Sequence, residues 1–287
     1  MRTIGRLTDQ VSDEIPASHR DLAGCPPVAA LSTVTPDGYP QTSVVWCDFD
    51  GECVRINTMR GFAKERNMRR NPRVTLLCYD PQRPLRYLEV RGMVVDMTQA
   101  GAAAHLDALA SKYAGRPVRF FGDVIPASFA ETEAPVLCRI RPARVTALDA
   151  TRLARRDSET WKHTTGLMTV LAAVPASHRD LLTGPACGVF TTLGHEGQPR
   201  STLVRAEADD SRVPANTALG RPGSRDPHGT QKVSLLVVDP RNTSRFIQIR
   251  GDAELVAPAP FEHRETGVAC LIHPRRVTLD AVHIADH

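Results

Sequence analysis

The octapeptide IPASHRDL at residues 15–22 returns as VPASHRDL at residues 174–181, an offset of 159 positions. The same offset continues without a gap, and 26 of the 78 positions from 15 to 92 are identical in the second stretch. Similarity at one fixed offset over such a length indicates an internal duplication. The chain therefore contains two copies of one module.

The repeat resumes near the end of each copy at a shorter offset. VLCRIRP at 136–142 matches VACLIHP at 268–274, an offset of 132, so the second copy lacks 27 residues (159 minus 132). The loss falls between 97 and 136, where AGAAAHLDALASKYAG in the first copy has helical apolar spacing. We expect two domains, 1–150 and 158–287, joined by the charged segment TRLARRDSET.

Within each copy the pattern predicts mainly short strands. In the first copy, 28–35 and 39–49 form a predicted hairpin around Pro36-Asp37-Gly38, and Asp50-Gly51 turns the chain into a third strand. A short helix at 62–70, stopped by Asn71-Pro72, separates the third strand from the fourth. Six strands with one short helix between them suggest a small closed barrel, so the fold class is mainly β. The third to sixth strands are expected at 53–59, 73–79, 86–95 and 136–148.

Composition limits the classes of protein. At 287 residues and 41% hydrophobic residues, the chain can fill proper cores. It has no apolar run of eighteen residues, and MRTIGRLTDQ at the start lacks a signal-peptide core, so we expect a cytoplasmic protein without a membrane span. The seven cysteines form no CxxC pair or metal-ligand cluster, which predicts buried free thiols and no metal. A net charge of +4 gives no general case for a nucleic-acid or membrane partner.

A cationic stretch in the first copy, residues 55–73, is the candidate ligand-binding segment. It has seven cations against one acid, Glu65. A strand ending at Asn57-Thr58 leads through Gly61 into the basic helix, and such strand-end polar groups, helix N–H groups and cations together suit a phosphate. A solvated basic face is the alternative interpretation. The cations are Arg55, Arg60, Lys64, Arg66, Arg69, Arg70 and Arg73.

The duplication supplies a control for this interpretation. In the second copy the equivalent stretch is ALGRPGSRDPHGTQKV, where Gly223 replaces Lys64 and Pro222 and Pro227 forbid a regular helix. A basic helix that served only solubility would be expected in both copies. The difference favours a ligand site in the first copy and none in the second.

Several segments of the first copy carry a family resemblance. They resemble the split-barrel flavin and deazaflavin proteins related to pyridoxamine 5′-phosphate oxidase. The resemblance implies two tandem six-stranded split β-barrels of the FMN-binding type, forming an intramolecular pseudo-dimer in which the degenerate second copy is the built-in partner surface. The segments are LSTVTPDGYPQTSVVW, INTMRGFAKERNMRRNPRVTLLCYDPQRPLRYLEVRGMV, LDALASKYAG and CRIRPARVTAL.

The long middle segment, residues 56–94, is most similar to the branch that uses the deazaflavin coenzyme F420. There a Lys-x-x-Asn-(x)-Arg-Arg-(x)-Pro-Arg pattern lies at the cofactor phosphate. By position, the resemblance implies that Lys64 and the Asn57-Thr58 pair hold the phosphate and that residues 41–44 line the ring system. The implied cofactor-binding residues are Gln41, Thr42, Ser43, Val44, Arg55, Asn57, Thr58, Arg60, Lys64, Arg69 and Arg70.

Two aromatic residues are candidates for the substrate pocket. Trp46, which is Arg205 in the second copy, would flank the ring, although a core or interface position is equally consistent. Tyr113 would close the pocket or only anchor its helix. His19 and His178 both lie in the repeated PASHRD element, which favours capping or packing over catalysis.

The resemblance implies an oxidoreductase that transfers hydride from reduced F420 to an electron-poor small molecule, with one cofactor per chain. The cofactor performs the chemistry and the protein orients it, so no catalytic side chain is expected. The alternatives are an FMN-dependent oxidase or reductase of the pyridoxamine-phosphate-oxidase type and a non-catalytic flavin- or haem-binding protein. Nucleic-acid binding ranks last, because Phe62 is the one aromatic residue among the cations.

Overall fold

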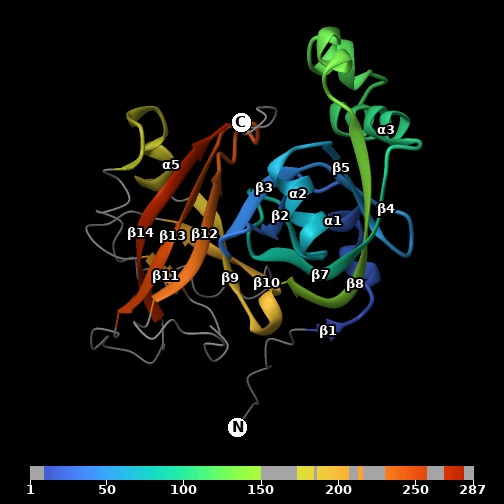
Figure 1. Ribbon diagram of the computed structural model, residues 1–287. Helices are drawn as coiled ribbons and strands as arrows, with labels where there is room; N and C mark the ends of the chain where they lie inside the picture. Colours follow the sequence, from blue (N-terminus) through green and yellow to red (C-terminus); the bar gives the residue numbers. More distant parts are fainter. Residues whose placement is uncertain are drawn as a thin grey trace.

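A computed structural model of the chain describes residues 10–149, 173–183, 186–206, 213–215, 230–256 and 268–280. These residues form two antiparallel sheets that lie side by side, one from each copy (Figure 1). The strand order is β3-β2-β6-β7-β8-β5-β4 in the first sheet, with β1 paired to β8, and β10-β9-β12-β13-β14-β11 in the second.

A single residue connects the two end strands of the first sheet. The end strands of its path, β3 and β4, are joined directly at Trp46, and β3 pairs with β2 while β4 pairs with β5. The expectation of one continuous strand over 39–49 was therefore wrong, because the chain changes partner at Trp46 to curl the sheet into a barrel. The strands are β1 (Gln10–Ser12), β2 (Val28–Val34), β3 (Pro40–Val45), β4 (Cys47–Phe49), β5 (Val54–Met59), β6 (Arg73–Tyr79), β7 (Arg86–Thr98) and β8 (Pro135–Asp149).

The second sheet repeats this topology. Replacing β3, β2, β6, β7, β8 and β5 by their equivalents in the second copy gives the observed order, while β1 and β4 have no counterpart among the described strands. This confirms a mainly β fold of two split barrels in tandem. Its strands are β9 (Ala186–Leu193), β10 (Pro199–Ala206), β11 (Val213–Ala215), β12 (Thr230–Val238), β13 (Phe246–Val256) and β14 (Val268–Leu279).

Short helices connect the strands. The predicted basic helix is α2 (Ala63–Arg70), and the helix predicted between 97 and 136 is α3 (Ala102–Ala114), which lies at one end of the first sheet (Figure 1). The remaining helical segments are η1 (Ala17–His19), α1 (Arg20–Gly24), η2 (Phe120–Val124), η3 (Ala127–Glu131), η4 (Ala176–His178), α5 (Asp180–Thr183) and η5 (His195–Gly197).

The repeated PASHRD element has the same structural role in both copies. His19 Nε2 lies 3.1 Å from the carbonyl oxygen of Leu148, and His178 Nε2 lies 2.9 Å from Asp280 Oδ2, so each histidine ties the element to the end of the last strand of its copy. Both histidines are buried. This confirms the packing role predicted from their repetition.

Four hydroxyl groups lie buried between the two barrels. Ser32 Oγ is 2.9 Å from Thr42 Oγ1, 3.1 Å from Thr191 Oγ1 and 3.0 Å from Ser201 Oγ. Thr191 Oγ1 is also 3.0 Å from both Thr42 Oγ1 and Ser201 Oγ. Because Thr191 and Ser201 are the repeat equivalents of Ser32 and Thr42, this hydroxyl cluster marks a pseudo-twofold relation between the copies.

Apolar and polar contacts surround the hydroxyl cluster. Tyr39 Oη donates to Asp252 at 2.8 Å, and the backbone N–H of Ser201 donates to Glu89 Oε1 at 3.0 Å. The two barrels therefore cover, within one chain, a sheet face that points away from each barrel's own core. The apolar side chains buried in this shared layer are Val28, Ala30, Leu77, Tyr79, Val189, Leu236, Val238 and Phe246.

Candidate functional site

A pocket in the first barrel opens between β5, the start of α2 and helix α3. Its lining combines the end of β3 with segments of the predicted cationic stretch and with residues that follow β7. The lining residues are Val44, Val45, Trp46, Asn57, Thr58, Met59, Phe62, Lys64, Leu106, Leu109 and Phe120. Five of the residues predicted from sequence therefore meet at one place: Val44, Trp46, Asn57, Thr58 and Lys64.

Part of the pocket lining is polar, and two of its buried atoms lack an internal hydrogen-bond partner. Asn57 Oδ1 and Thr58 Oγ1 are buried atoms that have no hydrogen-bond partner, and Lys64 lines the same space. Leaving buried polar atoms unsatisfied costs free energy, so these two atoms offer hydrogen-bonding capacity that a ligand in the pocket could use. Ser43 Oγ, on the neighbouring strand β3, is also buried without a partner.

Another part of the lining is aromatic. The Trp46 ring stacks on Tyr113 with centroids 5.3 Å apart and an interplanar angle of 22°, and it meets Phe120 edge-on at 5.9 Å. Tyr113 Oη accepts a hydrogen bond from the Cys47 N–H at 3.2 Å, and burial raises the pKa of Tyr113. Trp46 therefore lines the pocket, while Tyr113 supports it from behind.

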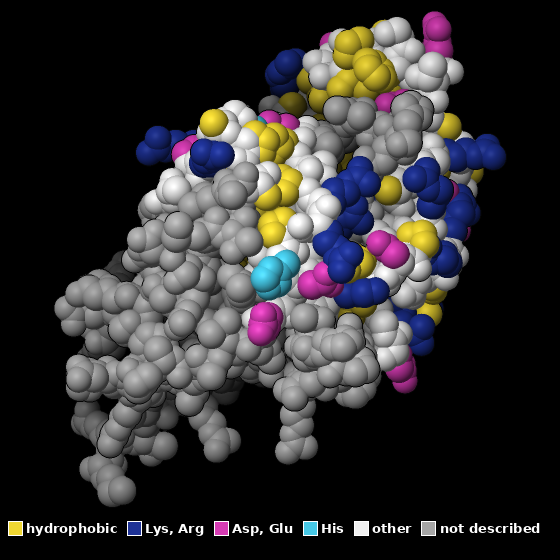
Figure 2. Space-filling view, turned by 60° about the vertical axis from the view of Figure 1, so that its left-hand side comes forward, with side chains coloured by type: hydrophobic (Ala, Val, Ile, Leu, Met, Phe, Trp, Pro, Cys, Tyr) yellow, Lys and Arg dark blue, Asp and Glu magenta, His cyan; other side chains and the backbone are white. Residues whose placement is uncertain are grey.

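Several cations of α2 hold the helix in place. Arg69 pairs with Glu65, Arg66 donates to the Gly61 carbonyl, and Arg70 Nη2 donates to the Val34 carbonyl at 2.7 Å. These side chains are exposed, and Figure 2 shows Lys and Arg side chains gathered on one face beside acidic ones.

Of the seven predicted cations, all within the described residues, only Lys64 lines the pocket. The structure does not bring Arg69 or Arg70 to it, because both are bound elsewhere. Arg60 is exposed at the end of β5.

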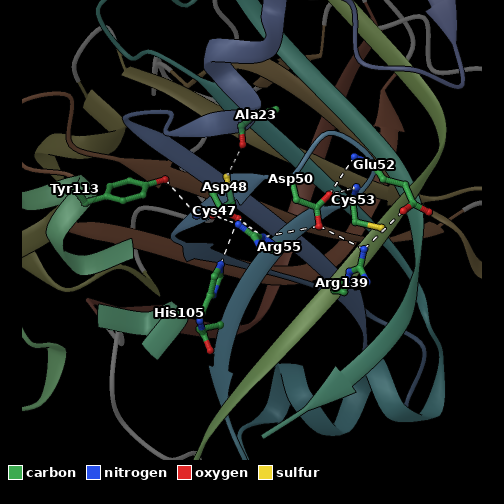
Figure 3. Close-up of polar contacts among 11 residues, drawn as sticks. Ala23, Cys47, Asp48, Asp50, Glu52, Cys53, Arg55, His105, Tyr113 and Arg139 are labelled. Carbon is green, nitrogen blue, oxygen red and sulfur yellow. Dashed lines mark hydrogen bonds and ion pairs between the residues drawn. The ribbon is translucent and has the colours of Figure 1, made fainter. Parts of the chain in front are cut away.

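Arg55 is engaged away from the pocket lining (Figure 3). Its guanidinium forms a bidentate pair with Asp48, with Nε to Oδ1 at 2.8 Å and Nη2 to Oδ2 at 2.6 Å. Burial alone would raise the pKa of Asp48, but hydrogen bonds from His105 and Arg55 outweigh it and lower the pKa to about 2. The charge of Arg55 is therefore balanced within the protein.

Sequence reasoning missed His105, which links this ion pair to the pocket. His105 Nε2 lies 3.3 Å from Asp48 Oδ1, and Nδ1 lies 2.5 Å from Asn57 Nδ2 (Figure 3 shows His105 beside Asp48). The signal that was available is that His105 falls in the segment from which the second copy has lost 27 residues.

The strand residues predicted to line the ring system separate into different environments. Thr42 belongs to the hydroxyl cluster between the barrels, and Gln41 Oε1 accepts a hydrogen bond from Asn67 Nδ2 at 2.8 Å. Asn67 also donates to Thr33 Oγ1 at 3.1 Å, so it attaches α2 to β2 and β3. Of residues 41–44, only Val44 lines the pocket.

Other predictions are tested only where the structure describes the chain. The loss of the ligand site in the second copy, predicted at Pro222, Gly223 and Pro227, lies outside the described residues. Among the residues that are described, no group of three or more His, Cys, Asp or Glu side chains is arranged to hold a metal ion, and six cysteines are free. In the same part of the chain, no helix is both long and apolar enough to cross a bilayer.

Comparison with known families identifies the first copy. Residues 15–149 match the family model of pyridoxamine 5′-phosphate oxidase. This part of the chain belongs to that family. Pyridoxamine 5′-phosphate oxidase-like proteins bind flavins and are commonly oxidoreductases.

Three solved structures similar to this chain each cover about half of it. An F420 reductase is 34% identical over 46% of this chain and 98% of its own, with a TM-score of 0.39. A conserved hypothetical protein from Mycobacterium tuberculosis is 23% identical over 54% of this chain and 94% of its own, with a TM-score of 0.39. A pyridoxamine 5′-phosphate oxidase-like protein from Listeria innocua is 17% identical over 42% and 88%, with a TM-score of 0.32. No curated protein matches the chain.

Proposed function

We propose that the first barrel binds a flavin-type cofactor and that the chain transfers hydride between this cofactor and an electron-poor small molecule. The observation that carries the proposal is the composition of one pocket: Trp46 and Phe120 form an aromatic wall, and Lys64 lies with unpartnered buried Asn57 and Thr58 atoms. A planar ring system fits the first part, and the Lys64 ammonium and Thr58 hydroxyl of the second part suit a phosphate ester.

The roles of the side chains follow from their chemistry. The Lys64 ammonium and the Thr58 hydroxyl can both donate hydrogen bonds, so they would hold the phosphate. Trp46 would orient the ring, and Leu106 and Leu109 of α3 would keep water from the reacting face. When bound, the cofactor supplies the hydride, so the protein contributes position and exclusion of water.

The deazaflavin F420 is our first choice of cofactor and FMN is the alternative. The similarity of residues 56–94 to the F420-using branch supports the deazaflavin. The number of cations favours F420 over FMN less than the sequence suggests. Cations would suit the polyglutamate tail of F420, but Arg55 and Arg69 are already paired with Asp48 and Glu65. Direct comparison of the two cofactors is therefore needed.

The test is a titration of the purified chain with F420 and with FMN, followed by fluorescence. Lys64→Ala is expected to weaken binding by about tenfold or more, since a charge-assisted hydrogen bond is lost. Lys112→Ala, at an exposed position of α3, removes the same charge outside the pocket lining and should leave affinity unchanged.

The outcomes separate the alternatives. Binding of FMN without binding of F420 would reassign the cofactor. Binding of neither, or equal losses in Lys64→Ala and Lys112→Ala, would overturn the proposed site.

A further inference from the structure

Three residues form a hydrogen-bonded series that ends at the pocket. Asp48 is on β4, His105 on α3 and Asn57 on β5, so three elements meet there. The His105 and Asp48 side chains are 9% and 15% exposed, which shields their contacts from competition with water. Each hydrogen bond in the series therefore has an assignable donor and acceptor.

That assignment can be worked out from the acceptor at one end. Asp48 is ionised at neutral pH, and a carboxylate only accepts hydrogen bonds, so His105 Nε2 must be the donor. His105 Nδ1 faces Asn57 Nδ2, and an amide nitrogen can only donate, so Nδ1 is the acceptor. The Asn57 amide donates to His105, which leaves Asn57 Oδ1 as the buried atom without a partner.

We propose that the Asp48–His105 pair is a positioning device that holds the Asn57 amide with its oxygen toward the pocket, so that the site selects a ligand group bearing a hydrogen-bond donor. This inference rests on the proposed function and refines it. In oxidised FMN the donor comes from one of two sources, the imide N–H of the ring or a hydroxyl of the ribityl chain next to the phosphate.

The duplication shows that a barrel forms without this device. Asn57 is retained in the second copy as Asn216, but Asp48 becomes Glu207, Arg55 becomes Pro214, and His105 lies in the segment that the second copy has largely lost. A role confined to barrel stability would apply to both copies. The restriction of the device to the copy with the pocket points to the ligand.

The first test uses the ligand-free full chain. Nitrogen-15 NMR of the histidine side chains, with His105 assigned by its absence in His105→Gln, should show a proton on Nε2 and none on Nδ1. In Asp48→Asn the side chain at 48 can also donate, so the preference for this tautomer should be lost. Asp50→Asn, which removes an equal charge near the same Arg55, should keep it. A proton on Nδ1 in the unmodified chain would overturn the proposal.

The second test measures selection by the pocket. FMN is compared with N3-methyl-FMN, which lacks the imide N–H, and with deoxyribityl analogues that lack single hydroxyls. The analogue missing the recognised donor should bind about tenfold more weakly than FMN to the unmodified chain and to Asp50→Asn, and equally to Asp48→Asn. Loss of affinity with N3-methyl-FMN identifies the ring edge as the source, and loss with a deoxy analogue identifies the polyol chain.

The two tests fail in different ways. If FMN and its analogues do not bind, F420 and F420 analogues lacking the same donors take their place. If none of these ligands binds, the proposed function fails, whereas the NMR result still decides the orientation of Asn57. If they bind but no analogue is discriminated against, the selection is overturned and the proposed function stands.

Discussion

The hydroxyls of Ser32 and Thr191 lie 3.1 Å apart between the two barrels, although the residues are 159 positions apart in the chain. They are the same position of the repeat, so each copy contacts its own counterpart. Contact between equivalent residues is the mark of a twofold interface. Here the interface is internal to one chain, and the two surfaces have become slightly different.

The hydroxyl cluster should be sensitive to loss of one member. Thr191→Val keeps the shape of the side chain but removes a hydroxyl that contacts three others, so buried partners lose a hydrogen bond. We expect the free energy of unfolding to fall by about 1–3 kcal/mol in urea titrations. Thr132→Val, at an exposed position, should change it by less than about 0.5 kcal/mol. Equal effects would mean that the cluster contributes nothing specific.

Two equivalent glycines should be intolerant of a side chain. A Cβ at Gly92 would overlap the Arg141 carbonyl oxygen, and one at Gly251 would overlap that of His273. Both lie where the strand register shifts, and the carbonyl is backbone that cannot move aside. Each Gly→Ala substitution is expected to cost about 1–3 kcal/mol of stability. Gly24→Ala, which meets no atom within 4 Å, is the control and should leave the melting temperature within a few degrees of the original.

Asp48 should make stability depend on acid pH. Its pKa in the folded chain is about 2, below the value of about 3.9 for an unfolded chain. The stabilisation is therefore complete above pH 4 and is lost as the pH falls toward 2; its size is on the order of 2 kcal/mol. Asp48→Asn should be less stable than the original at pH 7 and nearly equal to it at pH 2, measured by urea unfolding at each pH. Asp13→Asn, at an exposed site, is the control and should change the free energy of unfolding at pH 7 by less than about 0.5 kcal/mol.

Ligand binding should be reported by one of the two tryptophans. Trp46 lines the pocket and stacks on Tyr113, whereas the other tryptophan is Trp161. Addition of F420 or FMN should quench the Trp161→Phe variant, in which only Trp46 emits, by about half or more, because the ring would lie within contact distance. Under the same conditions the Trp46→Phe variant should show a much smaller change. Quenching confined to Trp46→Phe would place the ligand elsewhere.

Much of the fold could be predicted because it depends on local patterns and on repetition. Proline and glycine spacing marked α2 and the hairpins, and the fixed offset showed that two similar barrels were present. The break at Trp46 was missed, because both sides of it have strand-forming residues and the change of partner is a property of the closed sheet. Strand β1 was missed because three residues carry too little periodicity.

The candidate site was predicted only in part for a related reason. The stretch 55–73 contains Asn57, Thr58 and Lys64, but it does not show which cations are already paired. The pairing of Arg55 with Asp48 could have been found, because a hairpin turning at Asp50-Gly51 places these residues opposite each other. The part of the pocket lining that α3 supplies depends on tertiary packing between residues some fifty positions apart. Local sequence pattern does not encode such packing.

Because the two barrels belong to one chain, their interface responds to dilution and to mutation differently from the interface of a dimer. In a dimer of separate subunits the interface forms only above a certain concentration, and every substitution appears on both sides of it. Here Ser32 and Thr191 meet at an effective concentration set by the connecting chain, so the interface persists at any dilution. Each copy also accumulates substitutions independently, which allowed the first copy to keep Asp48, His105 and Lys64 while the sequence of the second copy changed.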